Sequence, residues 1–224
     1  METRQEFEFE SVIARICDLN WAALSEDELT NAAWAYYYFS IQFRENLEIA
    51  RRLHPEDSKL QQLEQEECDT SNLSPWPGVA LPGEKMNHDE FMRRALQLSP
   101  LAARERSRIE TLGEAYLDAV RATDDTARAL SIASYEDGGL ERVFHAFLGA
   151  RHWNTPLLQA FRHFLTQHIK FDSDPEQGHG ALSRHLRLDD RILPLWTEFE
   201  HILVDAAPAL AASPAETERA VIYS

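Results

Sequence analysis

The chain has 224 residues, of which 44% are hydrophobic, 10% aromatic and 27% charged, a composition typical of a globular protein with a sizeable core. Its 38 acidic and 22 basic residues give a formal net charge of −16, and no long basic stripe appears, so we expect no nucleic-acid partner. The two cysteines form no disulfide framework and favour the cytoplasm. We expect no signal peptide and no membrane span, because no apolar run reaches ~18 residues.

Helical periodicity and capping residues recur through the first half of the chain. The stretch Ser25-Glu26-Asp27-Glu28 has the form of a capping box, which opens a helix. A loop rich in proline and glycine separates the early helices from the later ones. The helices expected here run from Glu6 to Asp18, from Ser25 to about Leu53, from the His54–Asp57 turn to about Asp69, from His88 through Leu96, and from Ser99 to about Ala122.

The second half shows the same periodicity. We expect helices from Asp124 or Asp125 to about Leu148, from Thr155 to Asp172, from Asp189 to about Ala207, and a short one from Ser213. Gly138 and Gly139 should bend the first of these. No alternating, strand-like segment of useful length occurs. The sequence therefore predicts an all-α protein, a single domain of about eight or nine helices over residues 1–224.

The most informative stretch is HIKFDSDPEQGHGALSRHL, from His168 to Leu186. On a helix, the spacing of His168, Asp172 and His179 returns all three to one face. The residues before them mark that face as core-facing: Phe161, Phe164 and Leu165. Buried imidazoles and carboxylates are costly unless they are paired or bind a metal. Because Pro175 cannot continue a hydrogen-bonded helix, we expect a break near Asp174 and a restart that carries His179.

Other helices also place acids or imidazoles on apolar faces, at Glu45, Glu67, His88 and Glu136. Glu136 is the clearest, because its neighbours on the helix are all apolar: Ala129, Ile132, Ala133, Leu140 and Val143. A structural role stays open for each of the others. Glu45 could pair with an arginine, Glu67 lies in a charged neighbourhood, and His88 at a helix start could be exposed.

Together these residues predict a metal centre built from carboxylates and imidazoles on several helices, a set that suits iron or manganese. Six ligands are about right for two Fe(II) ions with open positions for dioxygen. The proposed ligands are Glu45, His88, Glu136, His168, Asp172 and His179, with Glu67 as a further candidate. Ferritin-like bundles hold their metals with two Glu-x-x-His pairs on facing helices, and we expect a different helical scaffold for the ligands proposed here.

At these residues the chain resembles the haem-oxygenase-like di-iron oxidases and oxygenases, single helical domains related in fold to haem oxygenase and thiaminase II. The third core helix of that family carries His-x-x-x-Asp followed by His, which is similar to His168, Asp172 and His179, although here the last spacing is longer and includes Pro175. The family's earlier ligands look like Glu45, His88 and Glu136. A second carboxylate near His88 would be Glu67 or Glu84. The resemblance extends from about Trp34 to Leu203.

The resemblance implies an oxidoreductase that uses two non-haem Fe(II) ions and dioxygen, with an electron donor, to act on a small molecule in specialised-metabolite biosynthesis. Family members oxygenate amines, cleave or desaturate amino acids, or form nitriles, so the substrate should be an amino acid or an amine. An amino acid would need an arginine for its carboxylate, and Arg44, Arg52 and Arg162 are candidates. The chain could act as a homodimer.

Two alternatives stay open. The chain could be a metal-free enzyme similar to thiaminase II or to the synthase of a quinone cofactor. The thiaminase chemistry would need a catalytic cysteine, for which Cys68 is the candidate, although its acidic surroundings should raise its pKa. The chain could also be a non-catalytic helical binding protein in which the buried acids form salt bridges.

Overall fold

The computed structural model describes residues 7–172, 182–183, 185–186 and 188–211, and this part of the chain is all-α, as predicted. It contains two isolated β-bridges, Thr70–Met86 and Trp76–Ala80. The predicted break near Asp174, the restart that carries His179 and the short helix from Ser213 fall outside the described residues. The α-helices are α1 (Glu8–Asp18), α2 (Glu26–Leu53), α3 (Ser58–Cys68), α4 (His88–Ala95), α5 (Ala103–Arg121), α6 (Asp125–Ser134), α7 (Leu140–Phe147), α8 (Pro156–Asp172) and α10 (Leu193–Ala206).

Helix α2 is the centre of the bundle. The predicted capping box starts it: Ser25 Oγ accepts a hydrogen bond from the Glu28 amide, and Glu28 accepts one from the Ser25 amide, at 3.2 Å each. Helix α2 packs against α3, α4, α5, α6, α8 and α10, which explains why its apolar residues are not confined to one face.

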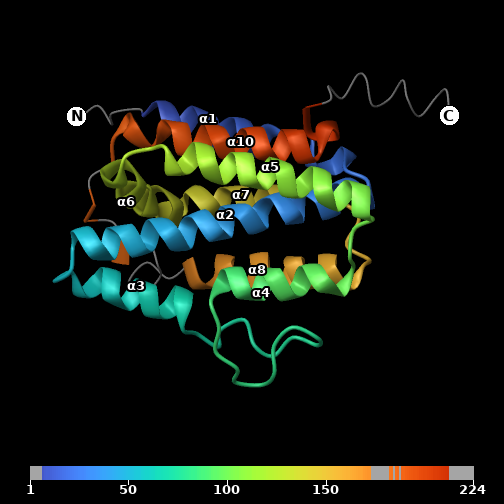
Figure 1. Ribbon diagram of the computed structural model, residues 1–224, viewed down its shortest axis with the longest axis horizontal. Coiled ribbons are helices and arrows are strands. Elements are labelled where there is room, and N and C mark those ends of the chain that lie inside the picture. Colours follow the sequence, from blue (N-terminus) through green and yellow to red (C-terminus); the bar gives the residue numbers. More distant parts are fainter. Residues whose placement is uncertain (1–6, 173–181, 184, 187, 212–224) are drawn as a thin grey trace.

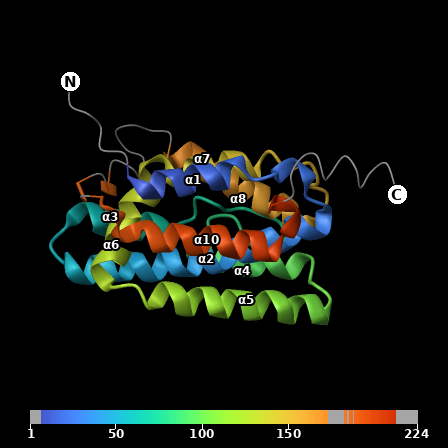
Figure 2. The same cartoon turned by 90° about the horizontal axis from the view of Figure 1, so that it is seen from above.

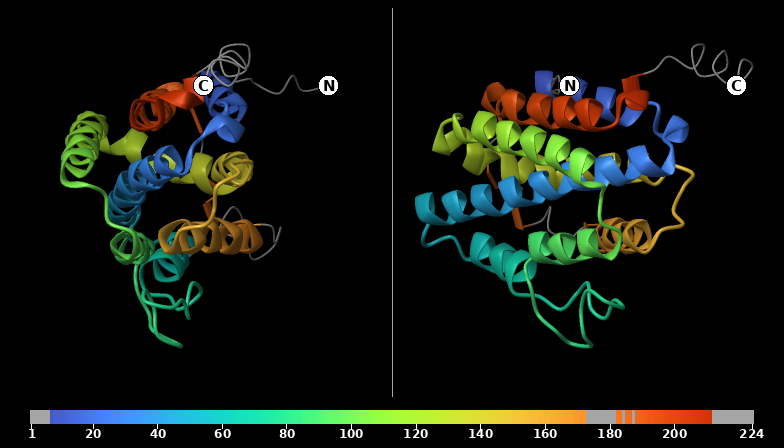
Figure 3. Two further views of the ribbon diagram at one scale, coloured as in Figure 1. Left: turned by 90° about the vertical axis from the view of Figure 1, so that its right-hand side faces the viewer. Right: turned by 45° about the vertical axis from the view of Figure 1, so that its right-hand side comes forward.

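The helices lie in three layers, with α2, α6 and α7 in the middle (Figure 1). Helices α1, α5 and α10 cover one side, and α3, α4 and α8 cover the other, as the end-on view in Figure 3 also shows. Seen from above, α10 runs along α2, with α5 beside both (Figure 2). The loop between α3 and α4 extends from the lower layer in Figure 1. One continuous hydrophobic core joins the layers.

The predicted bend at the two glycines is a π-helical segment, η3 (Tyr135–Gly139), which joins α6 to α7. Gly138 adopts φ +89°, a left-handed conformation that favours glycine. A Cβ at Gly139 would overlap the carbonyl oxygen of Ser134 and lie 2.9 Å from the Trp196 ring. Segments of this kind are frequent at functional sites, and this one carries the buried Glu136.

The two glycines should therefore respond differently to alanine. Gly139→Ala forces the π-helical segment away from the Ser134 carbonyl and should lower the free energy of unfolding by about 1–3 kcal/mol. At Gly138 the space around a Cβ is open, so Gly138→Ala should cost only the left-handed strain, about 1 kcal/mol. Urea unfolding of both variants measures the difference. Equal costs would contradict the close approach at Gly139.

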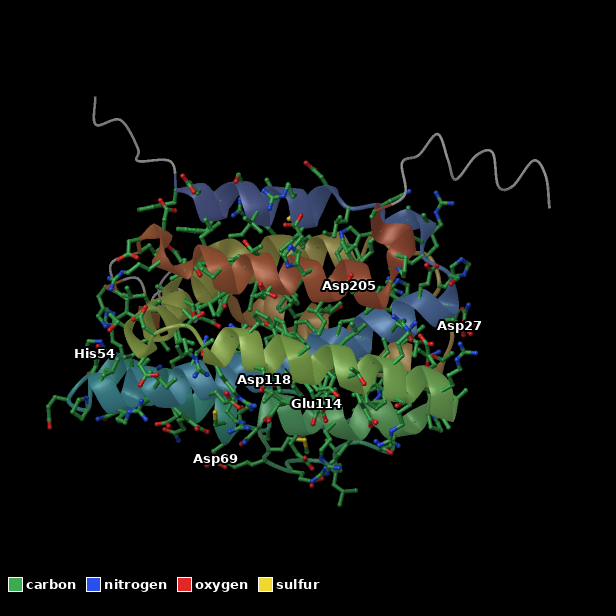
Figure 4. All side chains as sticks on the ribbon, turned by 45° about the horizontal axis from the view of Figure 1, so that its top comes forward. Asp27, His54, Asp69, Glu114, Asp118 and Asp205 are labelled. Atoms are coloured by element: carbon green, nitrogen blue, oxygen red, sulfur yellow. The ribbon has the colours of Figure 1, made fainter. Side chains whose placement is uncertain are left out.

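The outer surface carries much of the negative charge. Glu114, Asp118 and Asp205 are exposed on α5 and α10 (Figure 4). Among the helices of the described residues, none has both the length and the hydropathy needed to cross a membrane.

Candidate metal centre

His168 extends from α8 toward the middle of the bundle and is 6% exposed. The Thr155 hydroxyl accepts a hydrogen bond from the Leu158 amide in the first turn of this helix, as its sequence predicts. The imidazole stacks on the Phe164 ring with a centroid distance of 4.1 Å. Its Nδ1 lies 2.9 Å from the Phe164 carbonyl oxygen. The stacking and the hydrogen bond together fix the His168 ring, so that its Nε2 points away from α8.

His88 is the first residue of α4, and its ring is also 6% exposed. Its Nε2 lies 3.1 Å from Oδ1 of Asn72, in the loop between α3 and α4. On the other side of the ring, Nδ1 lies 2.9 Å from Nε2 of His168 and 2.5 Å from Oε2 of Glu67. Glu67, in the last turn of α3, is 4% exposed. Three helices thus bring two imidazoles and a carboxylate together, with ligand atoms within 4.8 Å of one another.

The hydrogen bonds determine which ring nitrogens face this group. The Asn72 amide oxygen and the Phe164 carbonyl oxygen can only accept, so His88 carries a proton on Nε2 and His168 carries one on Nδ1. In neutral rings, the two nitrogens that face each other across 2.9 Å are then both electron-pair donors. The Glu67 carboxylate adds a third donor. With this assignment, the three residues could hold a metal ion together.

The donor spacing fits a metal ion with little rearrangement. Ligands at 2.0–2.2 Å from a metal and at right angles to one another lie about 3 Å apart. The contacts of His88 with Glu67 and with His168, at 2.5 and 2.9 Å, are slightly shorter than this, so these two pairs have to open by only a few tenths of an ångström. The hydrogen bonds to Asn72 and Phe164 are the kind of outer contact that orients metal-binding imidazoles.

Glu136 lines the same cavity as these three residues, from η3, and is 6% exposed. Aromatic and aliphatic side chains form most of the remaining wall: Tyr36, Phe39, Phe43, Leu140 and Phe164, with Ser40. The cavity has a volume of about 20 Å³, where roughly 10–15 Å³ holds one water molecule. It therefore has space for a metal ion with a small ligand. A larger hollow of about 810 Å³, on the side of η3 toward α1, is lined by Asp137 and His145 but contains none of the three clustered donors.

Of the residues predicted as ligands, the structure brings His88, His168 and Glu136 to one cavity, together with Glu67. His179 lies outside the described residues, as does the side chain of Asp172 at the end of α8. Glu84, the other carboxylate candidate near His88, instead pairs with Arg94 at 2.7 Å and accepts a hydrogen bond from the Leu81 amide.

The structure does not place Glu45 at this cavity. Its carboxylate contacts Arg121 on α5, at 2.5 Å, and Arg128 on α6, at 3.1 Å. Helix α2 instead presents Phe39, Ser40 and Phe43 to the cavity. Since α2 is packed on several sides, an apolar neighbourhood along the helix did not indicate which neighbour Glu45 faces. The prediction that Glu45 binds a metal is therefore corrected: Glu45 forms a structural ion pair with Arg121 and Arg128.

The ion pair predicts a pH-dependent stability effect. Burial raises the pKa of Glu45, but the hydrogen bonds and charges of Arg121 and Arg128 outweigh it, so the pKa lies below its ordinary value of 4.5. A carboxyl whose pKa is lowered by folding stabilises the protein above the unfolded pKa and loses that effect as the pH falls. Glu45→Gln should cost about 1–3 kcal/mol at neutral pH, less than a fully buried pair.

Urea unfolding at neutral pH and below pH 4.5 tests this expectation. The difference between Glu45→Gln and the wild type should shrink at the lower pH, and iron binding should be unchanged in the variant. A loss of iron binding in Glu45→Gln would contradict the corrected assignment.

The structure disfavours Cys68 as a catalytic nucleophile. Burial, with the charges of Glu67 and Asp89, raises the pKa of Cys68 to about 12, so little of it is the reactive thiolate.

The arginines considered for an amino-acid carboxylate do not line the cavity. Arg44 pairs with Asp89 and Glu48, Arg52 pairs with Asp125, and Arg162 lies over the Trp153 ring. The lining residues described for the cavity include no arginine or lysine.

Sequence reasoning missed Asn72, which belongs to a loop without periodicity. The available signal was its place between two candidate ligands, Glu67 and His88.

Comparison of the chain with protein-family models, with curated proteins and with solved structures finds no match in any of the three.

Proposed function

We propose that this chain is a non-haem iron enzyme that activates dioxygen to oxidise a small molecule, with a fold of the haem-oxygenase-like kind. The observation that carries this proposal is the convergence of Glu67, His88 and His168 on one point inside the bundle. Two histidines and one carboxylate, with further positions open, form the ligand set typical of non-haem Fe(II) oxygenases.

The surroundings of the site favour dioxygen chemistry over hydrolysis. Two histidines and a glutamate also bind zinc in hydrolases, which need access for water and for a polar substrate. Here all three donors are buried and the cavity wall is largely aromatic. A small apolar molecule such as dioxygen enters a cavity of this kind at lower cost than a peptide or an ester does.

A second iron would be held on the Glu136 side of the cavity. Glu136 would supply a carboxylate to it, and Asp172 and His179 are proposed to complete that second site. Carboxylates on both sides of the cavity would offset most of the charge of two Fe(II) ions, while neutral imidazoles add none. The proposal is therefore two Fe(II) ions per chain.

When bound, the iron would supply the electrons that reduce dioxygen. The side chains of this protein hold and shield it. The Asn72 amide and the Phe164 carbonyl orient the two imidazoles, and the aromatic wall excludes bulk water, which strengthens electrostatic interactions inside the cavity.

The cavity also bears on the substrate. Its described lining carries two carboxylates and no cationic side chain, so it suits an amine better than a free amino-acid carboxylate. An amine can also gain from contact with the aromatic rings. A volume of about 20 Å³ excludes any organic substrate, so binding requires side chains of the wall to change rotamer.

Oxygen consumption tests this function. The protein, loaded with Fe(II) without oxygen and supplied with a chemical reductant, should consume dioxygen faster than free Fe(II), and primary amines should accelerate the reaction more than the corresponding carboxylic acids. Zinc-loaded protein is the control. If the iron-loaded protein consumes dioxygen no faster than free Fe(II) with every amine in the panel, the proposal fails, and the metal-free enzyme and the binding protein are the remaining alternatives.

A further inference from the structure

The loop between α3 and α4 is tied to the helices around it. Its ends pair through Thr70 and Met86, whose backbones exchange hydrogen bonds of 3.4 and 2.9 Å. The Leu73 carbonyl lies 3.1 Å from Nε2 of His163 on α8, and the Val79 carbonyl accepts a hydrogen bond of 3.0 Å from Arg94 on α4. The start of this loop is therefore fixed relative to the helices that carry Glu67, His88 and His168.

Asn72 lies at the start of this loop and contacts the chain on both sides. Its amide nitrogen donates a long hydrogen bond of 3.5 Å to the Glu66 carbonyl oxygen, in the last turn of α3. Because an amide nitrogen donates and a carbonyl oxygen accepts, this contact determines which way the Asn72 amide faces. Its oxygen Oδ1 then points to His88 Nε2, 3.1 Å away. Asn72 thus connects the residue before Glu67 to the ring of His88.

We propose that Asn72 is a positioning residue that makes Nδ1 of His88 the metal-binding nitrogen. This inference rests on the proposed metal site. By accepting a hydrogen bond from Nε2–H, Asn72 keeps the proton of the neutral ring on Nε2, and Nδ1 is the nitrogen that faces Glu67 and His168. His168 uses the opposite nitrogen, Nε2, because its Nδ1 is held by the Phe164 carbonyl.

An amide is well suited to this position. Metal-binding histidines commonly donate their second N–H to a carboxylate or a carbonyl oxygen. A carboxylate here would add a further negative charge to a buried site that already contains Glu67 and Glu136, and buried charge is costly in the metal-free protein. The neutral Asn72 orients the ring without adding that charge.

Two substitutions separate this role from simple support of α3. Asn72→Leu removes both the oxygen that accepts from His88 and the nitrogen that donates to Glu66. Asn72→Asp keeps the accepting oxygen and loses the donor. If Asn72 only supports the end of α3, the two variants should behave alike. If it selects the nitrogen of His88, only Asn72→Leu should change which nitrogen of the ring carries the proton.

The experiment combines imidazole ¹⁵N NMR of the apo protein with anaerobic Fe(II) titration. In the wild type, His88 should carry its proton on Nε2. In Asn72→Leu, the proton should distribute over both nitrogens and Fe(II) affinity should fall about 10–100-fold, while Asn72→Asp keeps the wild-type tautomer. Gln61→Leu is the matched control, because the Gln61 amide also donates to a backbone carbonyl but on the exposed side of α3.

The outcomes are distinct. Wild-type His88 with its proton on Nδ1 would overturn the inference, even if Asn72→Leu does not fold. Wild-type affinity and tautomer in Asn72→Leu would also overturn it and would leave the proposed iron site intact. A wild-type protein that binds no Fe(II) would instead overturn the proposed function, and the inference with it.

Discussion

His168→Ala should abolish stoichiometric iron binding while the helical circular dichroism signal stays near wild type. The structure gives the reason: Nε2 of His168 is one of three donors that converge at the site. Structural zinc sites bind with about 10–16 kcal/mol, which is about 2.5–4 kcal/mol for each of four ligands. A loss of this size weakens binding at least about 70-fold. Removal of the ring also leaves a cavity beside Phe164, which should lower stability by about 2–4 kcal/mol.

His201→Ala is the matched control for this substitution. His201 lies on α10, is exposed and contacts Glu198 at 3.8 Å. It does not line the cavity. The control variant should bind iron like the wild type. Undiminished iron binding by His168→Ala, measured by metal analysis after desalting, would show that the site is elsewhere.

Glu136→Gln should retain at least one iron and lose its oxygen reactivity. Glutamine has nearly the same shape as glutamate but no charge, and Glu67, His88 and His168 still provide three ligands. Without the Glu136 carboxylate, the proposed second iron would lose a ligand, so the rate of oxygen consumption should fall by about 100-fold.

Glu141→Gln provides the comparison, since Glu141 lies on α7 beyond the π-helical segment and its nearest basic partner is His145, at 3.8 Å. It should react with dioxygen like the wild type. Stopped-flow measurement of oxygen consumption distinguishes the variants. If Glu136→Gln and Glu141→Gln both react at the wild-type rate, Glu136 has no part in the chemistry.

Most of the secondary structure could be predicted from the sequence, because helix starts and bends depend on local signals. The capping box at Ser25 starts α2, and the glycine pair at Gly138 bends the helix that carries Glu136. Helix α5 begins later than expected, at Ala103, because a 3-10 turn (Leu96–Leu98) extends α4 and a short irregular segment follows it. The start expected at Glu6 lies outside the described residues, and α1 is described from Glu8.

The site was predictable where one face of a helix is clearly buried, as for His168 and Glu136. It was not predictable for Glu45, because tertiary packing around α2 determines whether a carboxylate meets a cavity or an arginine. Glu67 was uncertain because its charged neighbours in the sequence favour a position facing solvent. Only the packing of α3 against α2 brings its carboxylate to His88. The role of Asn72 depends on a loop conformation that no sequence period encodes.

Anomalous diffraction at the iron edge, from crystals loaded with Fe(II) under anaerobic conditions, tests the central claim most directly. The account predicts an anomalous peak about 2.0–2.2 Å from Glu67 Oε2, His88 Nδ1 and His168 Nε2, and a second peak on the Glu136 side for the second iron. A fully loaded crystal with no peak among Glu67, His88 and His168, or with a peak only at the protein surface, would contradict it.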